Sequence, residues 1–308
     1  MKLSTLNLLL LLIAAGLFGW LAIDEHTERL SIAKAIERQP PLTALDPNVI
    51  RRIRLHHPGG TDIVLEKAAS GWQMKAPVAL AADLLPIADL LALATRETRG
   101  SLDPATVKRA EVGLDPPLAT IQFDDTVIAI GATEPLKHSR YVEHIGASSA
   151  ARIQLVDDFP AEPFDDDFTD LVNKALLPFD AVITRLALPG LIVSRDPAAA
   201  DAWTTIPASS TDRQAELQQR VRAWHEVRAV ATLPPMIDTA AAGNATADVT
   251  VTLGQGDPLA FRIVDKAGAR FLQRLDVPVS YQLSPADADR LLTWPATSAA
   301  RAPAGAAR

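Results

Sequence analysis

The chain contains no cysteine among its 308 residues. This absence excludes a disulfide scaffold, a thiol nucleophile, an iron–sulfur cluster and any zinc site with Cys ligands. Histidine is scarce, with six residues, and aromatic residues make up only 5% of the chain. Basic residues do not dominate either, because the formal net charge is −7. A nucleic-acid-binding surface is basic, so we expect no nucleic-acid partner.

Apolar residues are abundant, at 48% of the chain, which is far above the level of a disordered protein. A domain has roughly 150 residues, so the length favours about two domains. Each would be large enough to bury its own hydrophobic core.

A long apolar run lies at the N-terminus, where Leu6 to Ile23 read LNLLLLLIAAGLFGWLAI. At ~1.5 Å per residue this run forms a helix of about 27 Å, which matches the hydrocarbon core of a bilayer. We expect an uncleaved transmembrane signal anchor over residues 1–23. A cleaved signal peptide and a buried core helix are the alternatives.

The charges that flank this run predict its orientation. Lys2 precedes it, whereas Asp24, Glu25 and Glu28 follow it. Because positive residues stay in the cytoplasm, we expect a single-pass protein of the cell inner membrane with the bulk of the chain in the periplasm.

The next residues, 24–45, are expected to form a stalk. Leu30, Ala33 and Ile36 have helical spacing, and the Pro40-Pro41 pair would end the helix. We interpret this segment as a spacer. A specific binding helix is the alternative.

Beyond the stalk, short alternating runs predict strands, among them Ala119–Phe123 and Val249–Leu253. Two longer periodic runs predict helices at Ala82–Ala94 and about Arg213–Val230. The second half repeats the first about 130 residues later, which is a marker of duplication. The matched residues are Trp72 with Trp203, Pro77 with Pro207, Thr120 with Thr250, Arg140-Tyr141-Val142 with Arg270-Phe271-Leu272, and Gln154-Leu155 with Gln282-Leu283.

The predicted fold class is α+β: an N-terminal transmembrane helix is followed by two tandem repeats of a mostly antiparallel sheet with one main helix each. The first repeat unit covers residues 46–179 and the second covers 180–295. Residues 296–308 are rich in Ala, Pro and Arg, and we expect a disordered tail there.

Several of these elements resemble the family called domain of unknown function 4340. They are Trp72, the helix start at Ala82-Asp83, Gly113-Leu114-Asp115-x-Pro117, Ile130-Gly131 and Arg140-Tyr141-Val142. The resemblance covers about Asp46 to Phe179 and extends toward Trp294. Val112 stands where the family pattern has an aromatic residue. The resemblance implies an anchored extracytoplasmic protein, often associated with ABC-type export systems related to gliding-motility transporters, and it supplies no catalytic residue.

The search for chemistry begins with histidine. His56 and His57 are adjacent, and neighbouring side chains on a strand point to opposite faces, so they would not share one metal. His138 and His144 flank a predicted strand without a carboxylate at ligand spacing. We interpret these four residues as parts of strands and turns.

The other candidates also receive structural interpretations. Asp165-Asp166-Asp167, with Asp157, Asp158, Glu162 and Asp170 nearby, lacks the pattern of a calcium loop and reads as a solvated acidic linker. Gly254–Pro258 lacks a phosphate-loop ending and reads as a hairpin turn. The serine pairs Ser148-Ser149 and Ser209-Ser210 lack a nucleophile-elbow frame. Arg213, Arg220, Arg222 and Arg228 are expected on a solvated helix face, with a partner or an anionic lipid as the alternative.

We therefore predict no catalytic residue, no cofactor and no metal, and expect no enzyme. The leading hypothesis is a membrane-anchored interaction or scaffold protein with a protein partner in the membrane, an ABC-type transporter being one candidate. The alternative is an extracytoplasmic binding protein for a lipid, glycan or peptide in a groove between the two units.

Overall fold

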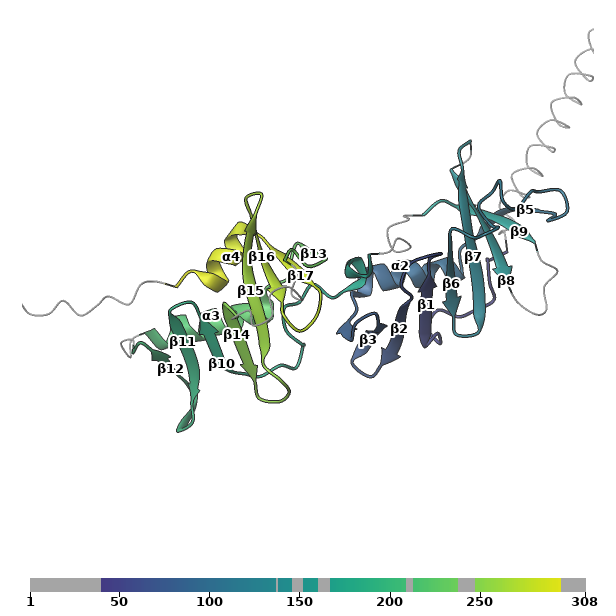
Figure 1. The fold of residues 1–308 in the computed structure, drawn as a ribbon. Coiled ribbons are helices and arrows are strands. Elements are labelled where there is room, and N and C mark those ends of the chain that lie inside the picture. Colours follow the sequence, from purple (N-terminus) through teal and green to yellow (C-terminus); the bar gives the residue numbers. More distant parts are fainter. Residues whose placement is uncertain are drawn as a thin grey trace, which may run out of the picture.

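The computed structural model describes residues 40–136, 138–145, 152–159, 167–208, 213–237 and 247–294. These residues form two antiparallel sheets and three α-helices (Figure 1). The predicted membrane anchor Leu6–Ile23 and the tail 296–308 lie outside the described residues. Among the described helices, none combines the length and the apolar character that a membrane span requires.

The first sheet has the strand order β4-β3-β2-β1-β6-β7-β8-β9-β5, and helix α2 (Leu84–Ala94) packs beside it. Strand β6 shows how the sequence forms this sheet, because its residues ATIQF alternate between buried and half-buried positions. The strands are β1 (Arg52–His56), β2 (Ile63–Ala68), β3 (Gly71–Ala76), β4 (Leu80–Ala81), β5 (Thr98–Leu102), β6 (Ala119–Phe123), β7 (Thr126–Glu134), β8 (Ser139–Ile145) and β9 (Ile153–Asp157).

The second sheet has the order β12-β11-β10-β14-β15-β16-β17-β13 and is accompanied by helices α3 (Gln214–Glu226) and α4 (Pro285–Leu292). Its strands are β10 (Ile183–Leu188), β11 (Leu191–Asp196), β12 (Ala199–Ile206), β13 (Ala231–Leu233), β14 (Val249–Leu253), β15 (Leu259–Lys266), β16 (Ala269–Arg274) and β17 (Ser280–Leu283).

The two sheets correspond strand by strand. Reading across each sheet, β3-β2-β1-β6-β7-β8-β9-β5 matches β12-β11-β10-β14-β15-β16-β17-β13, and β4 has no counterpart. Trp72 on β3 and Trp203 on β12 are both 6% exposed, as residues of the hydrophobic core. The strand correspondence agrees with the repeat seen in the sequence.

Two details of the prediction are wrong. The second unit carries two helices, because α4 follows β17. One of the residue matches between the two halves is also shifted by one position. Arg140 pairs with Val156 across the β8–β9 ladder, and Arg270 pairs with Leu283 across the β16–β17 ladder. Val156, rather than Leu155, therefore corresponds to Leu283.

The elements that the sequence did not predict are short or polar. Strand β5 reads TRGSL, and only Thr98 in it is buried, so it lacks a hydrophobic alternation. Helix α4 begins at a recognisable signal, since the Ser284 hydroxyl accepts the Asp287 N–H and Pro285 stands at the first helical position. Strands β4 and β13 have two and three residues, which is too short for a periodicity.

A single segment joins the two units. It starts with the 3-10 helix η2 (Phe168–Leu171), whose Asp167 N-cap accepts the Thr169 N–H. On one side Val172 forms a bridge with Ala82, which precedes α2. On the other side the Thr232 hydroxyl donates to the Thr169 carbonyl at 2.6 Å. This segment, which we call the junction strap (residues 167–177), is therefore bonded to both units.

Candidate functional site

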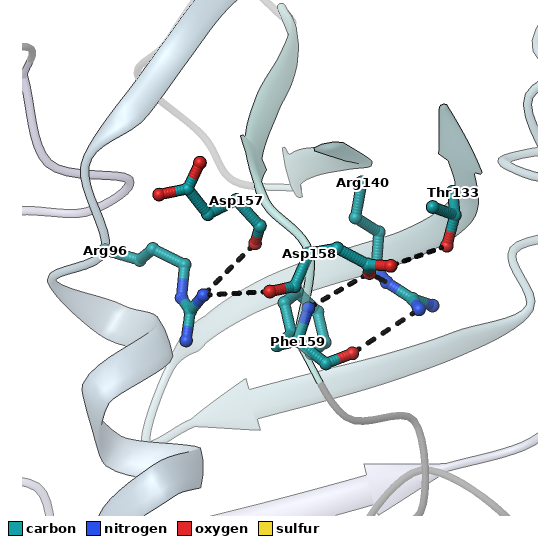
Figure 2. Close-up of polar contacts among 6 residues, drawn as sticks. All are labelled: Arg96, Thr133, Arg140, Asp157, Asp158 and Phe159. Carbon is teal, nitrogen blue, oxygen red and sulfur yellow. Dashed lines mark hydrogen bonds and ion pairs between the residues drawn. The ribbon is translucent and has the colours of Figure 1, made fainter. Parts of the chain in front are cut away.

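Arg140, the first residue of the Arg140-Tyr141-Val142 motif, belongs to a cluster of polar contacts around Asp158 in the first unit (Figure 2). It extends from β8, and only 12% of its side chain is exposed. Its Nε donates to Asp158 Oδ1 at 2.7 Å. Asp158 comes directly after β9, which is the last strand of the first sheet in chain order. The motif arginine therefore holds the segment by which the chain leaves the sheet.

Asp158 has a partner for each carboxylate oxygen. Oδ1 accepts from Arg140 and from the Phe159 N–H at 3.0 Å, and Oδ2 accepts from the Thr133 hydroxyl at 3.2 Å. Burial opposes ionisation of Asp158 and is the largest single influence. The Arg140 hydrogen bond and charge, with the Phe159 N–H and the Thr133 hydroxyl, outweigh it, so the pKa of Asp158 lies below its usual value.

The Phe159 ring is contacted by two guanidinium groups. The Arg140 guanidinium carbon lies 4.9 Å from the ring centroid, and that of Arg96 lies 5.4 Å from it. Arg96 follows α2 and also donates to the Asp157 carbonyl at 3.1 Å. Cation–π contacts of this kind contribute about 0.5–1 kcal/mol where they are exposed. The cluster thus ties the end of α2 to the end of β9 through one aromatic ring.

The neighbouring carboxylate belongs to a separate, more exposed pair. Asp157 accepts from Arg99 Nε at 2.7 Å and from its Nη2 at 2.5 Å. The Arg99 hydrogen bonds are the main reason why the pKa of Asp157 is lowered. Both side chains are about half exposed, so solvent screens this pair and it adds little stability.

The charged groups of this cluster bind one another in ion pairs. General acid–base catalysis needs a group with a proton to exchange near neutral pH. Here both carboxylates are bound to arginines, which favours their ionised form. A nucleophile would need an adjacent base, and Thr133 donates to Asp158, whose lowered pKa makes it a poor base. The contacts of this cluster therefore fix the segment that follows β9.

The second unit uses its matching arginine differently. Arg270 extends from β16 to Asp265 on β15, with Nε donating at 2.7 Å and Nη2 at 3.1 Å. Asp289 on α4 adds to the charges that raise the pKa of Arg270. The Arg270 pair therefore joins two neighbouring strands, β15 and β16, whereas the Arg140 pair joins β8 to the segment after β9.

The histidine candidates lie apart from this cluster or at its edge. His56 Nδ1 is 2.6 Å from Asp62 Oδ1 across the β1–β2 hairpin, and both side chains are well exposed. His57 lies in the turn beyond β1. His138 adopts a positive φ of 49° before β8, where its carbonyl accepts the Asp158 N–H at 2.9 Å. His144 lies near the far end of β8.

The acidic candidates are divided. Asp157 and Asp158 belong to the cluster, whereas Asp167 caps η2. Asp165, Asp166 and Glu162 lie outside the described residues, as do all four predicted serines of the Ser148-Ser149 and Ser209-Ser210 pairs. Gly254–Pro258 forms the connection between β14 and β15. In the part of the chain that the structure describes, no three His, Asp or Glu side chains meet as potential metal ligands.

One polar contact between the two units, made by Arg228, was not predicted from the sequence. Arg228 was expected on a solvated helix face, but it lies just past α3, with Nη2 3.7 Å from Asp83 Oδ2 and 3.2 Å from Asn173 Oδ1. Asp83 is the N-cap of α2, and Asn173 belongs to the junction strap. No sequence signal marks Arg228, because its partners are distant along the chain.

A shallow polar depression lies at the base of the first hairpin. It is lined by Arg51, Arg52, Glu66, Lys67, Asp124 and Asp125. Four of these six side chains are engaged within the chain: Arg52 binds Glu66 at 2.6 Å, Lys67 donates to the Asn48 carbonyl, and Asp124 accepts the Arg52 N–H. This depression is therefore a weaker candidate than the Arg140 cluster.

The comparison with protein families gives one result. The family model described as "Domain of unknown function (DUF4340)" matches residues 72–239, which include Trp72, Arg140, Asp158 and the junction strap. No curated protein and no solved structure matches the chain.

Proposed function

The chain belongs to the DUF4340 family, whose model covers more than half of its length, and from that premise we propose that it is a non-enzymatic, membrane-anchored interaction or scaffold protein. In this proposal the Leu6–Ile23 helix holds the chain in the inner membrane, and the two sheet units project into the periplasm. The partner would be a membrane protein, with an ABC-type transport complex as the first candidate.

One observation carries the proposal: Arg140 and Asp158, two polar residues that the sequence singles out, are used to hold the fold together. Arg140 and Asp158 bind each other, and Arg96 and Arg140 both contact Phe159. A scaffold needs such a fixed shape, whereas an enzyme needs some of these groups free to react.

The junction strap supports the same proposal. Leu171, Val172 and Leu176 are at most 1% exposed, and the strap is hydrogen-bonded to both units. The two units are thereby joined by buried contacts, which favours an extended rigid body over a pair that opens to admit a ligand between them. The duplicated strand order fits a protein that grew by repeating one binding module.

The experiment has two arms and uses the full chain expressed in its own membranes. Carbonate and high salt should fail to extract the protein, because a spanning helix is held by the hydrocarbon. Recovery of a soluble chain that begins near Asp24 would overturn the anchor.

The second arm is crosslinking in intact membranes followed by purification of the tagged chain. We expect subunits of an ABC-type transporter to be enriched, and enrichment should be lost when Leu6–Ile23 is deleted. A chain that instead carries a stoichiometric lipid, glycan or peptide, and no protein partner, would favour the binding-protein alternative.

A further inference from the structure

The outward face of the second sheet carries an exposed arginine, Arg185, on strand β10. Its side chain points away from the core, because the next residue, Leu186, is fully buried. Its neighbours across the two ladders are Ser194 on β11 and Thr252 on β14. Among the residues that the structure describes, none forms a hydrogen bond or an ion pair with the Arg185 guanidinium.

The corresponding arginine of the first sheet is bound within the chain. Arg52 pairs with Glu66 across the β1–β2 ladder, and its Nε and Nη2 donate to Glu66 Oε1 at 3.1 and 2.6 Å. Asp124 lies on the other side of Arg52, where its carboxylate accepts the Arg52 N–H at 2.9 Å. The arginine of the first sheet therefore lies between two carboxylates of its own chain.

The ladders establish which positions correspond. Glu66 and Ser194 each pair with the arginine of their unit, and each directly precedes the residue that pairs with its core tryptophan. On the other side, Asp124 and Thr252 each lie one residue beyond the partner of the buried residue that follows the arginine. Both carboxylates of the first sheet are thus replaced by hydroxyl groups in the second.

An apolar row lies beside Arg185 on the same face. Ala187, Ile192 and Ile206 are directly opposite one another on β10, β11 and β12. Ile206 is 67% exposed, and the other two are half-buried. The first sheet has a charged residue, Arg54, two residues after its arginine, where the second has Ala187. The second sheet therefore presents one unpaired cation next to apolar side chains.

We propose that this face of the second sheet docks a segment of the membrane partner that carries an Asp or Glu beside apolar side chains. The carboxylate would bind Arg185 as Glu66 binds Arg52, and the flanking hydroxyls are donors for its remaining lone pairs. The inference rests on the proposed function, because that function supplies the partner. The face, which we call the β10 outer face, consists of Arg185, Ala187, Ile192, Ser194, Ile206 and Thr252.

The combination of one cation with an apolar row selects this occupant. A free anion such as phosphate would bind the guanidinium but would leave Ile192 and Ile206 in contact with water. Insertion of the face into a bilayer would remove the guanidinium and the hydroxyls of Ser194 and Thr252 from water without partners. A protein segment with a carboxylate and apolar neighbours satisfies both rows at once.

The test replaces the arginine with a residue that can be joined to its partner. In Arg185→Lys the cation is kept, and a carbodiimide couples a lysine amine to a carboxylate that touches it. The full chain is treated in its own membranes, and mass spectrometry of the joined peptides identifies the partner residue. We expect position 185 to be joined to an Asp or Glu of another membrane protein, with at least ten times more of that product than in the wild type.

Two further variants control the test. Ser194→Glu, added to Arg185→Lys, supplies the carboxylate that the first sheet has at this position, so it should lower the yield at least five-fold. The fold tolerates this residue there, since Glu66 occupies the corresponding place. Arg52→Lys is the matched control in the first sheet. Because Glu66 takes up its amine, it should give no product with another protein above the wild-type level.

Three outcomes would overturn the inference. The first is no product above the wild-type level, and the second is an equal yield with and without Ser194→Glu. The third is a product that joins position 185 to a second copy, to the same chain or to a lipid headgroup. Each would show that no acidic segment of a partner occupies the β10 outer face.

The docking surface and the proposed function can fail separately. Enrichment of a transporter with the full chain, without any product at position 185, would leave the function and remove this surface. A product with an acidic protein segment on a chain that carbonate extracts would remove the anchor and leave the surface.

Discussion

Glu143 and Gln273 occupy the same position in corresponding strands, three residues after Arg140 on β8 and Arg270 on β16, and both are buried, at 3% and 0% exposed. Each side chain binds the loop that follows an edge strand, β5 in the first unit and β13 in the second. Glu143 binds Arg109, with Nη1 to Oε1 and Nη2 to Oε2 both at 2.6 Å. The Gln273 amide accepts the Ile237 N–H at 2.8 Å and donates to the Ile237 carbonyl at 2.6 Å.

The same task is therefore done by different chemistry. An amide has one acceptor and two donors and can satisfy both backbone groups of one residue, as a neighbouring strand would. A carboxylate only accepts, and in the first unit the loop supplies both a donor and an opposite charge through Arg109. A buried polar group of either kind stabilises the fold only while its partners are present.

Arg109→Met should destabilise the first unit. It leaves the Glu143 carboxylate buried without its cation, and loss of a charged hydrogen bond costs about 1.5–3 kcal/mol. Urea unfolding of the purified chain measures the loss. The double variant Arg109→Met with Glu143→Gln should recover a large part of it, because the amide carries no charge. If the double variant were no more stable than Arg109→Met, the buried charge would not be the cause.

Gln273→Ala should loosen the loop after β13 while the sheet remains folded. The Ile237 N–H and carbonyl lose their partners, and we expect a loss of about 1–3 kcal/mol. The readout is limited proteolysis, which should cut near Ile237 faster than in the wild type. Gln219→Ala, on the exposed side of α3, is the matched control and should leave the cleavage rate unchanged.

Much of the fold could be predicted from the sequence because its strands bury one face. Ala119–Phe123 and Val249–Leu253 were predicted with the bounds that β6 and β14 have, since apolar residues alternate in both. Strand β5 could not be predicted, because an edge strand such as TRGSL is stabilised by its ladder to β9 rather than by its own side chains. The sequence of β5 alone does not show that it pairs with β9, which lies far along the chain.

The candidate site could be predicted only in part. The motif identified Arg140, but Asp158 was interpreted as part of an acidic linker. The two are brought together by the β8–β9 ladder, in which Arg140 pairs with Val156. Only that register places the guanidinium beside the residue that follows the strand, and a register is a property of the pair of strands.

Asp158→Asn should change how stability depends on pH. The folded-state pKa of Asp158 is below its ordinary value, so its contribution is complete above about pH 5 and is lost as pH falls through the folded pKa. At pH 7 the variant should be less stable by about 1 kcal/mol, because a neutral amide replaces the charged partner of Arg140. That difference should shrink as pH falls below about 4, the ordinary pKa of an aspartate, toward the folded-state pKa, as measured by urea unfolding.

Asp125→Asn is the matched control, since Asp125 is exposed beside Asp124 on the turn between β6 and β7. At pH 7 this surface substitution should change the free energy of unfolding by less than about 0.5 kcal/mol. A difference for Asp158→Asn that does not depend on pH would mean that the carboxylate charge contributes nothing to stability.

Trp72→Ala and Trp203→Ala should each destabilise the chain by about 3–5 kcal/mol, the cost of removing a large side chain from a packed core. Both indoles are 6% exposed and lie on corresponding strands, so the two losses should be similar in size. Thermal and urea unfolding of the full chain measure them. Trp294→Ala is the control, because this indole is only partly buried under the Arg220 guanidinium, 5.0 Å away, and its loss should be smaller. A Trp72→Ala or Trp203→Ala variant with wild-type stability and a lost partner in crosslinking would reassign that indole from the core to a binding surface.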